Sequence, residues 1–133
     1  MKNTDFSISP EKEVYSADEE IKLVFSSITD FSYYTKYRFS ISLEEFDENE
    51  NRYVSSNSLT CIDTETTEKI EAFEYEKSNT SDNSAITKTF SIHATNQGKF
   101  ICYIEGFGYH FNEYGGASPE IKYEKIIYFR VSE

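Results

Sequence analysis

Several residue types are scarce in this chain of 133 residues, which has no tryptophan, one methionine, two prolines and five glycines. Its two cysteines, Cys61 and Cys102, are too few for a disulfide scaffold. No stretch is long and apolar enough to span a bilayer, so we expect no membrane insertion. The first ten residues also lack the apolar core of a signal peptide, which indicates a cytosolic protein or a trimmed start.

Basic residues are scarce as well, with 13 lysines and arginines against 24 aspartates and glutamates. The resulting formal net charge of -11 repels a phosphate backbone and an anionic lipid surface. We therefore expect no nucleic-acid partner. No motif for a cofactor is present either, so none is expected.

Aromatic residues supply much of the apolar content, with 11 tyrosines and 11 phenylalanines. Aromatic and β-branched residues suit a pleated, half-buried surface, whereas the strong helix formers alanine and leucine are few. The length fits one domain with its own core. The sequence therefore predicts a single all-β domain over residues 1–133.

Alternation of apolar and polar residues marks the strands. The clearest case is residues 37–46, where Tyr37, Phe39 and Ile41 alternate with polar residues. Pro10 and Pro119 fall in segments that we interpret as connections, with Pro10 interrupting an edge strand. We predict seven to nine strands in a two-sheet antiparallel sandwich, at residues 5–9, 12–15, 21–27, 37–46, 53–63, 68–76, 85–94, 99–107 and 123–133.

Two stretches carry a family resemblance. "SPEKEVYSADEEIKLVF" is similar to the opening of bacterial surface domains of the immunoglobulin-like class, and "NQGKFICYIEG" resembles their strand-F corner. The resemblance implies an immunoglobulin-like β-sandwich of the disulfide-free, secreted or surface-exposed bacterial type. No cysteine stands near Leu23, where the strand-B partner is expected, Phe39 replaces the strand-C tryptophan, and Phe100 replaces the corner tyrosine.

Cys61 is expected two strands away from Cys102 in the same sheet, at about 9.6 Å. A disulfide needs Cα atoms within about 7 Å. We therefore predict no bridge, and a buried packing role for Cys102.

Candidate catalytic and metal sites are weak. His93 and His110 accompany no hydrolase or protease signature, and His93 is expected on the exposed face of its strand. Asp47, Asn49 and Asn51 resemble the start of a calcium loop, but Arg52 occupies the glycine position of that loop. We predict an acidic hairpin turn there, with no metal and no catalytic residue.

Two aromatic segments, residues 26–36 and 106–122, are the strongest functional indication. As the B–C and F–G loops of a sandwich they would meet at one end, beside residues 77–84. Tyrosine is favoured in binding loops because it offers contact area at low entropic cost. The candidate ligand-binding residues are Phe31, Tyr33, Tyr34, Phe107, Tyr109, Phe111 and Tyr114.

The alternation at residues 107–111 leaves a second interpretation open, in which this segment extends a hairpin whose inner face belongs to the core. We predict a non-enzymatic, secreted or surface-exposed adhesion module that contacts a protein or glycan through these loops. The alternative is a spacer domain without a ligand of its own. A small hydrolase is a third hypothesis, and the sequence leaves a cytoplasmic location and the oligomeric state open.

Overall fold

Strands make up the regular structure of the chain. The structure is a computed structural model that describes residues 4–28, 34–77, 85–111 and 117–132; residues 4, 27–28, 34–37, 75–77, 85–86, 107–111 and 117–122 are described by their backbone alone. Within these ranges we find ten strands and no helix that could cross a membrane. The strands are β1 (Thr4–Ser9), β2 (Val14–Ser16), β3 (Ile21–Ile28), β4 (Tyr34–Asp47), β5 (Arg52–Ser55), β6 (Leu59–Asp63), β7 (Ala72–Lys77), β8 (Ala85–Ala94), β9 (Gly98–Phe111) and β10 (Ala117–Ser132).

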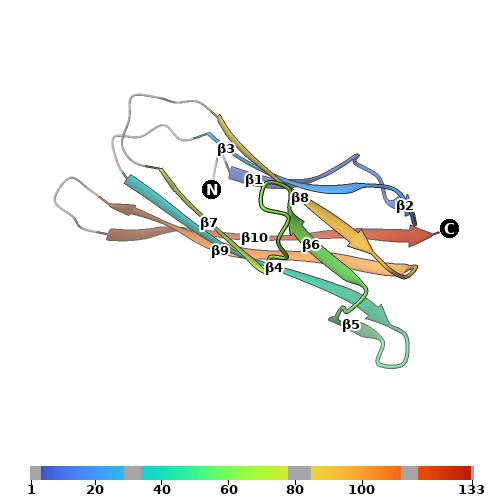
Figure 1. The fold of residues 1–133 in the computed structure, drawn as a ribbon. Helices are drawn as coiled ribbons and strands as arrows, with labels where there is room; N and C mark the ends of the chain where they lie inside the picture. Colours follow the sequence, from blue (N-terminus) through green and yellow to red (C-terminus); the bar gives the residue numbers. More distant parts are fainter. Residues whose placement is uncertain (1–3, 29–33, 78–84, 112–116, 133) are drawn as a thin grey trace.

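The strands form two layers (Figure 1). A four-stranded sheet has the order β1-β3-β8-β6. A six-stranded sheet has the order β2-β10-β9-β4-β5, and β7 also pairs with β4. Every strand pair is antiparallel except β2 with β10. The predicted two-sheet sandwich is confirmed, with one parallel edge and one strand more than the predicted maximum.

The chain changes sheets around Pro10. β1 pairs with β3 in the four-stranded sheet, and β2 then pairs with β10 in the other sheet. The predicted interruption of the edge strand is thus confirmed. Pro119 was wrongly placed in a connection, because it lies within β10 opposite Tyr109. A proline is tolerated there since this part of β10 pairs with β9 alone and a register shift follows it.

The single strand predicted at residues 53–63 is wrong, because β5 and β6 belong to different sheets. The crossing is made by a serine-rich turn. The hydroxyl of Ser56 accepts a bond from the Ser58 N–H (3.0 Å), and the Ser58 carbonyl accepts bonds from Thr95. Because the serine hydroxyl satisfies a turn amide locally, the ladder can stop and restart in the other layer.

The next connection also bridges the layers. The Ile70 N–H donates to the Cys61 carbonyl at 2.9 Å in the four-stranded sheet, and the Glu71 carbonyl accepts from Ile41 at 2.8 Å in the six-stranded sheet. β7 consequently begins at Ala72, later than the residue 68 predicted from the sequence.

The core contains a cluster of aromatic rings between the sheets. Phe6 lies 5.1 Å from both Phe25 and Phe39, measured between ring centroids, and Phe73 lies 5.0 Å from Phe25. Phe6, Phe25 and Phe39 are fully buried. Aromatic pairs at such distances contribute about 0.5–1.5 kcal/mol each beyond their buried area. Phenylalanine rings thus fill much of the space between the two sheets.

Both cysteines are free and buried. Cys102 packs among core residues of the six-stranded sheet, as predicted, but Cys61 lies on β6 in the opposite sheet and not two strands away in the same one. Burial raises the pKa of each thiol to about 12. The thiols are therefore protonated at neutral pH and inert as nucleophiles.

Tyr123 closes one side of the sandwich. Its hydroxyl accepts a hydrogen bond from the buried Phe6 N–H (3.0 Å) and donates one to the Asp5 carboxylate (2.6 Å). The Lys125 ammonium contacts the same carboxylate at 3.0 Å. These contacts join β1 of one sheet to β10 of the other.

Candidate binding site

The seven predicted binding residues fall into two groups. Phe31, Tyr33 and Tyr114 lie outside the described residues, as does most of the predicted third loop at residues 77–84. Tyr34, Phe107, Tyr109 and Phe111 lie in strands, and their backbone alone is described.

Backbone register brings the two predicted segments together. Tyr34 at the start of β4 is directly opposite Phe111 at the end of β9, and Tyr109 is opposite both Lys36 and Pro119. Much of what was predicted as the loops 26–36 and 106–122 is therefore strand. The second interpretation, in which residues 107–111 extend a hairpin, is therefore correct for the backbone. Figure 1 shows that β9 and β10 run beyond the four-stranded sheet at this end.

A second aromatic group was missed from the sequence. This group lies on the outer face of the six-stranded sheet and consists of Phe46, Tyr53 and Tyr128. It is near the end of β4 and the start of β9, at the other end of these strands from Tyr34 and Phe111. The ring centroids are 5.3 Å apart for Phe46 and Tyr53, and 6.2 Å apart for Tyr53 and Tyr128. Tyr128 is 63% exposed. The alternation of Ile126, Tyr128 and Arg130 with buried residues was a usable signal for this face.

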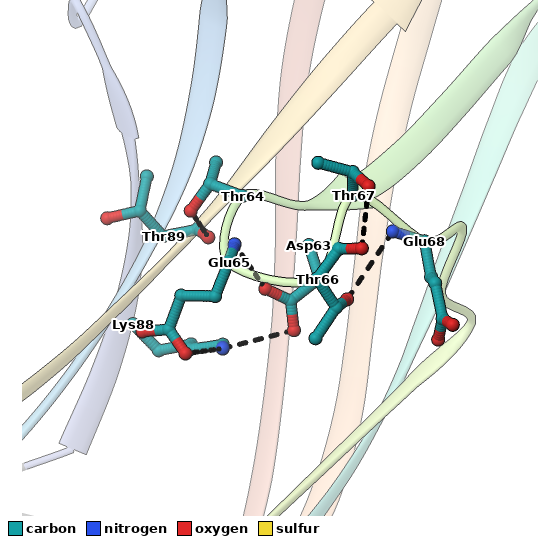
Figure 2. A network of polar contacts seen from close by, with 8 residues as sticks. All are labelled: Asp63, Thr64, Glu65, Thr66, Thr67, Glu68, Lys88 and Thr89. Carbon is teal, nitrogen blue, oxygen red and sulfur yellow. Dashed lines mark hydrogen bonds and ion pairs between the residues drawn. The ribbon is translucent and has the colours of Figure 1, made fainter.

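A network of polar contacts lies in the turn that follows β6 (Figure 2). The Lys88 ammonium, on β8, contacts the carboxylates of Asp63 and Glu65 at 3.0 Å each. The Asp63 carboxylate also accepts the Glu65 N–H at 2.9 Å, and the Thr64 hydroxyl donates to the Thr89 carbonyl at 2.8 Å. Each of these contacts ties the turn to itself or to β8, so the network is structural.

Electrostatics in this network follow from its geometry. Burial acts to raise the pKa of Asp63, but the Glu65 N–H and the Lys88 ammonium outweigh it, so the pKa lies below its usual value of 3.8. Burial acts to lower the pKa of Lys88, but the two carboxylates outweigh it and the pKa is raised above 10.5. Both groups thus remain charged at neutral pH.

The histidine candidates find no catalytic partner in the part of the chain that the structure describes. His93 is exposed, as predicted, and lines a surface hollow with Ser16, Glu19 and Glu20. Its imidazole forms no hydrogen bond with any described residue. The side chain of His110 lies outside the description.

The acidic segment after β4 is a hairpin turn, as predicted. The Asp47 carboxylate accepts hydrogen bonds from the N–H groups of Asn49 (2.8 Å) and Glu50 (3.2 Å). Asn51 has a φ of 54°, a conformation that asparagine tolerates well. The Asp47 side chain therefore serves the turn. Across the described residues, no group of three or more histidine, cysteine or acidic side chains could hold a metal ion.

Comparisons with known proteins bear on the fold. No protein-family model and no curated protein matches this sequence. Solved structures do match. The class 5 fimbriae chaperone CfaA aligns with a TM-score of 0.55 and 10% identity, over 95% of this chain and 55% of the chaperone. AggA, the major subunit of aggregative adherence fimbriae type I from Escherichia coli, aligns with a TM-score of 0.54 and 9% identity, over 97% of this chain and 94% of AggA.

The chain is an immunoglobulin-like β-sandwich. A DNA glycosylase from Pseudomonas fluorescens, AlkC, also aligns, with a TM-score of 0.50 and 10% identity over 97% of this chain and 29% of the glycosylase. This chain thus spans about half the length of the chaperone and less than a third of the glycosylase. At identities this low, the likeness shows a shared fold alone.

Proposed function

We propose that this immunoglobulin-like chain is a non-catalytic binding module, secreted or surface-exposed, that contacts a protein or glycan partner through the aromatic end of its six-stranded sheet. The carrying observation is the register that sets Tyr34 directly opposite Phe111. With Phe107 and Tyr109 on the same strand, it gathers four of the predicted aromatic residues onto two neighbouring strands. Phe31, Tyr33 and Tyr114 flank these strand ends in the sequence.

The fold gives this proposal a mechanical basis. β9 and β10 remain paired up to Phe111 and Ala117, so the aromatic residues stand on a hydrogen-bonded hairpin. A site held by strands loses less conformational entropy on binding than one on free loops. Fimbrial proteins also use this fold, which is compatible with a binding or structural role.

The test is a glycan array and a protein pull-down with the immobilised chain, comparing wild type with the Tyr109→Ala, Tyr114→Ala double variant. We expect binding by the wild type and at least about a tenfold loss in the variant, since aromatic anchors dominate such contacts. Tyr103→Ala is the matched control, because it removes a partly exposed tyrosine from the middle of β9. Binding of a protein or an uncharged glycan that survives in the double variant would overturn the proposal.

One observation favours the spacer as a second candidate function. The start of β1 pairs with the end of β3, and the end of β10 pairs with β2, which places Thr4 and Ser132 at opposite ends of the sandwich (Figure 1). That arrangement suits a module threaded between neighbours. Absence of any wild-type ligand in the array and the pull-down would favour this role over the binding module.

A further inference from the structure

Two cations lie side by side on the outer face of the six-stranded sheet, away from the aromatic end discussed above. Lys99 of β9 and Arg130 of β10 are directly opposite in the antiparallel register. Their strand neighbours Phe100 and Phe129 are buried in the core, so the two cations point outward, and both are exposed. Like charges directly opposite each other on adjacent strands destabilise a sheet.

Neither of these two cations has an acidic partner within ion-pair distance among the described residues. Neither forms an ion pair within 4 Å with any residue that the structure describes, although the chain carries 24 acidic residues. Glu13, Glu45 and Glu48 line the adjacent hollows without reaching that distance. The Lys99 ammonium instead lies 5.6 Å from the centroid of the Phe46 ring. Two adjacent cations without an ion-pair partner within 4 Å can accept an anion between them.

Aromatic and aliphatic groups surround this pair. Tyr128 is 63% exposed and lies near Tyr53, and Val14 of β2 is 48% exposed. Ile101, opposite Tyr128 on the same outer face, is buried, so the aromatic cover is well packed. Together with Lys99 and Arg130, the residues Val14, Tyr53 and Tyr128 line a shallow hollow of about 540 Å³. We call Lys99, Arg130, Tyr53 and Tyr128 the basic–aromatic patch.

The edge strands at this end are short. β2 pairs with β10 at Arg130–Ser132 and has three residues, and β5 pairs with β4 at Glu44–Asp47 and has four. Such edges offer a peptide only a short ladder, whereas Lys99 and Arg130 present their side chains on the face of the sheet, where a ligand would be held by side chains. An exposed aromatic ring offers a flat apolar surface for a sugar ring, while paired cations bind a carboxylate or a sulfate.

We infer that the basic–aromatic patch binds a short anionic glycan, with the acidic group between Lys99 and Arg130 and a sugar ring on Tyr128. The negative charge of the rest of the chain restricts the ligand to a short one, because a long polyanion would be repelled beyond the patch. This site lies at the other end of the sheet from the proposed aromatic binding end, so the two can fail independently.

The test is a chemical-shift titration of the isotope-labelled chain at low salt. The carboxylated probe is sialyllactose and the sulfated probe is a heparin-derived tetrasaccharide; lactose and polyglutamate are the controls. We expect one or both charged sugars to shift resonances of β9 and β10 around Lys99 and Arg130, and lactose to bind at least about tenfold more weakly. The two charged probes distinguish carboxylate from sulfate recognition.

Variants then assign the contacts. Lys99→Gln with Arg130→Gln should weaken binding about tenfold or more, and Tyr128→Ala about fivefold. The matched control is Lys22→Gln with Lys69→Gln, which makes the same change of charge at exposed lysines elsewhere and should have less than a twofold effect. Unchanged melting temperatures would show that each variant is folded.

Three outcomes would overturn the inference. The first is the absence of shifts with both charged sugars at millimolar concentration. The second is binding of polyglutamate as tight as that of the sugars and indifferent to Tyr128→Ala, which would mean attraction by charge alone. The third is that the Lys22, Lys69 control variant weakens binding as much as the Lys99, Arg130 variant does. That result would mean that the overall charge of the chain, and not the patch, determines binding.

Discussion

Gly106 lies on β9 where this strand is paired with both β4 and β10. It is opposite Phe39 in the β4–β9 register and is buried. A Cβ atom at this position would lie 2.5 Å from the Arg38 carbonyl oxygen and as close to the Phe39 ring. Neither neighbour can yield cheaply, because one is backbone and the other is a fully buried ring.

We therefore expect Gly106→Ala to lower the free energy of unfolding by about 3 kcal/mol, the upper end of the usual cost of overpacking. Urea denaturation measured by circular dichroism would test this. Ser42→Ala on the exposed face of β4 is the control and should change stability by less than about 0.5 kcal/mol. A Gly106→Ala variant as stable as the control would show that β4 and β9 separate freely.

At the scale of single residues, the alternation of apolar and polar residues predicted correctly which side chains are buried. It did not predict which residues lie opposite each other on neighbouring strands. Phe39, Ile41, Phe100 and Cys102 are buried as the period-two pattern requires. The alternation within one strand does not identify the residue opposite on the next strand, because that residue depends on which strands pair. The adjacency of Lys99 and Arg130 was therefore hidden, and Cys61 was placed in the wrong sheet.

Elements were predicted best where alternation was long and unbroken. Residues 85–94 form β8 with the predicted bounds, and the clear pattern at 37–46 lies within β4. The error at residues 53–63 arose because a turn of serines, without glycine or proline, keeps the polar alternation of a strand. The segment from residue 106 was predicted to be a loop because Gly106 and Gly108 are typical turn residues. Both glycines lie inside β9, so the loop was predicted to begin too early.

The turn after β6 gives a prediction at the scale of the element, because Asp63 and Lys88 join it to β8. The pKa of Asp63 is lowered on folding, so its contribution is present above its unfolded value of 3.8 and is lost as the pH falls through the folded value. The pKa of Lys88 is raised, so its contribution is lost only at strongly alkaline pH.

We expect Asp63→Asn to lower the free energy of unfolding by about 1–2 kcal/mol at pH 7 and to have less effect at pH 3, because the contribution of the carboxylate diminishes as the pH falls below the unfolded value of 3.8 towards the folded one. Urea unfolding of both proteins at the two pH values measures the difference. Asp18→Asn, at an exposed position, should have little effect at either pH. An Asp63→Asn penalty that is the same at pH 7 and pH 3 would contradict the role of the charge.

For the whole molecule, the dominant electrostatic feature is the formal net charge of -11. Such an excess destabilises a compact chain by self-repulsion. Several described ion pairs are exposed, such as Arg38 with Glu74 and Arg52 with Glu50, and exposed pairs contribute little. Screening should therefore remove more repulsion than attraction.

We expect the melting temperature to rise by about 3–5 °C as NaCl is raised from about 20 mM to 500 mM, equivalent to about 1 kcal/mol. Differential scanning calorimetry would measure it, with KCl as a check that charge screening and not a specific ion is responsible. The same increase in salt should weaken the binding of anionic ligands to the basic–aromatic patch. Stability and binding affinity would then change in opposite directions. A melting temperature that falls with salt would mean that local pairs such as Lys88 with Asp63 outweigh the repulsion across the molecule.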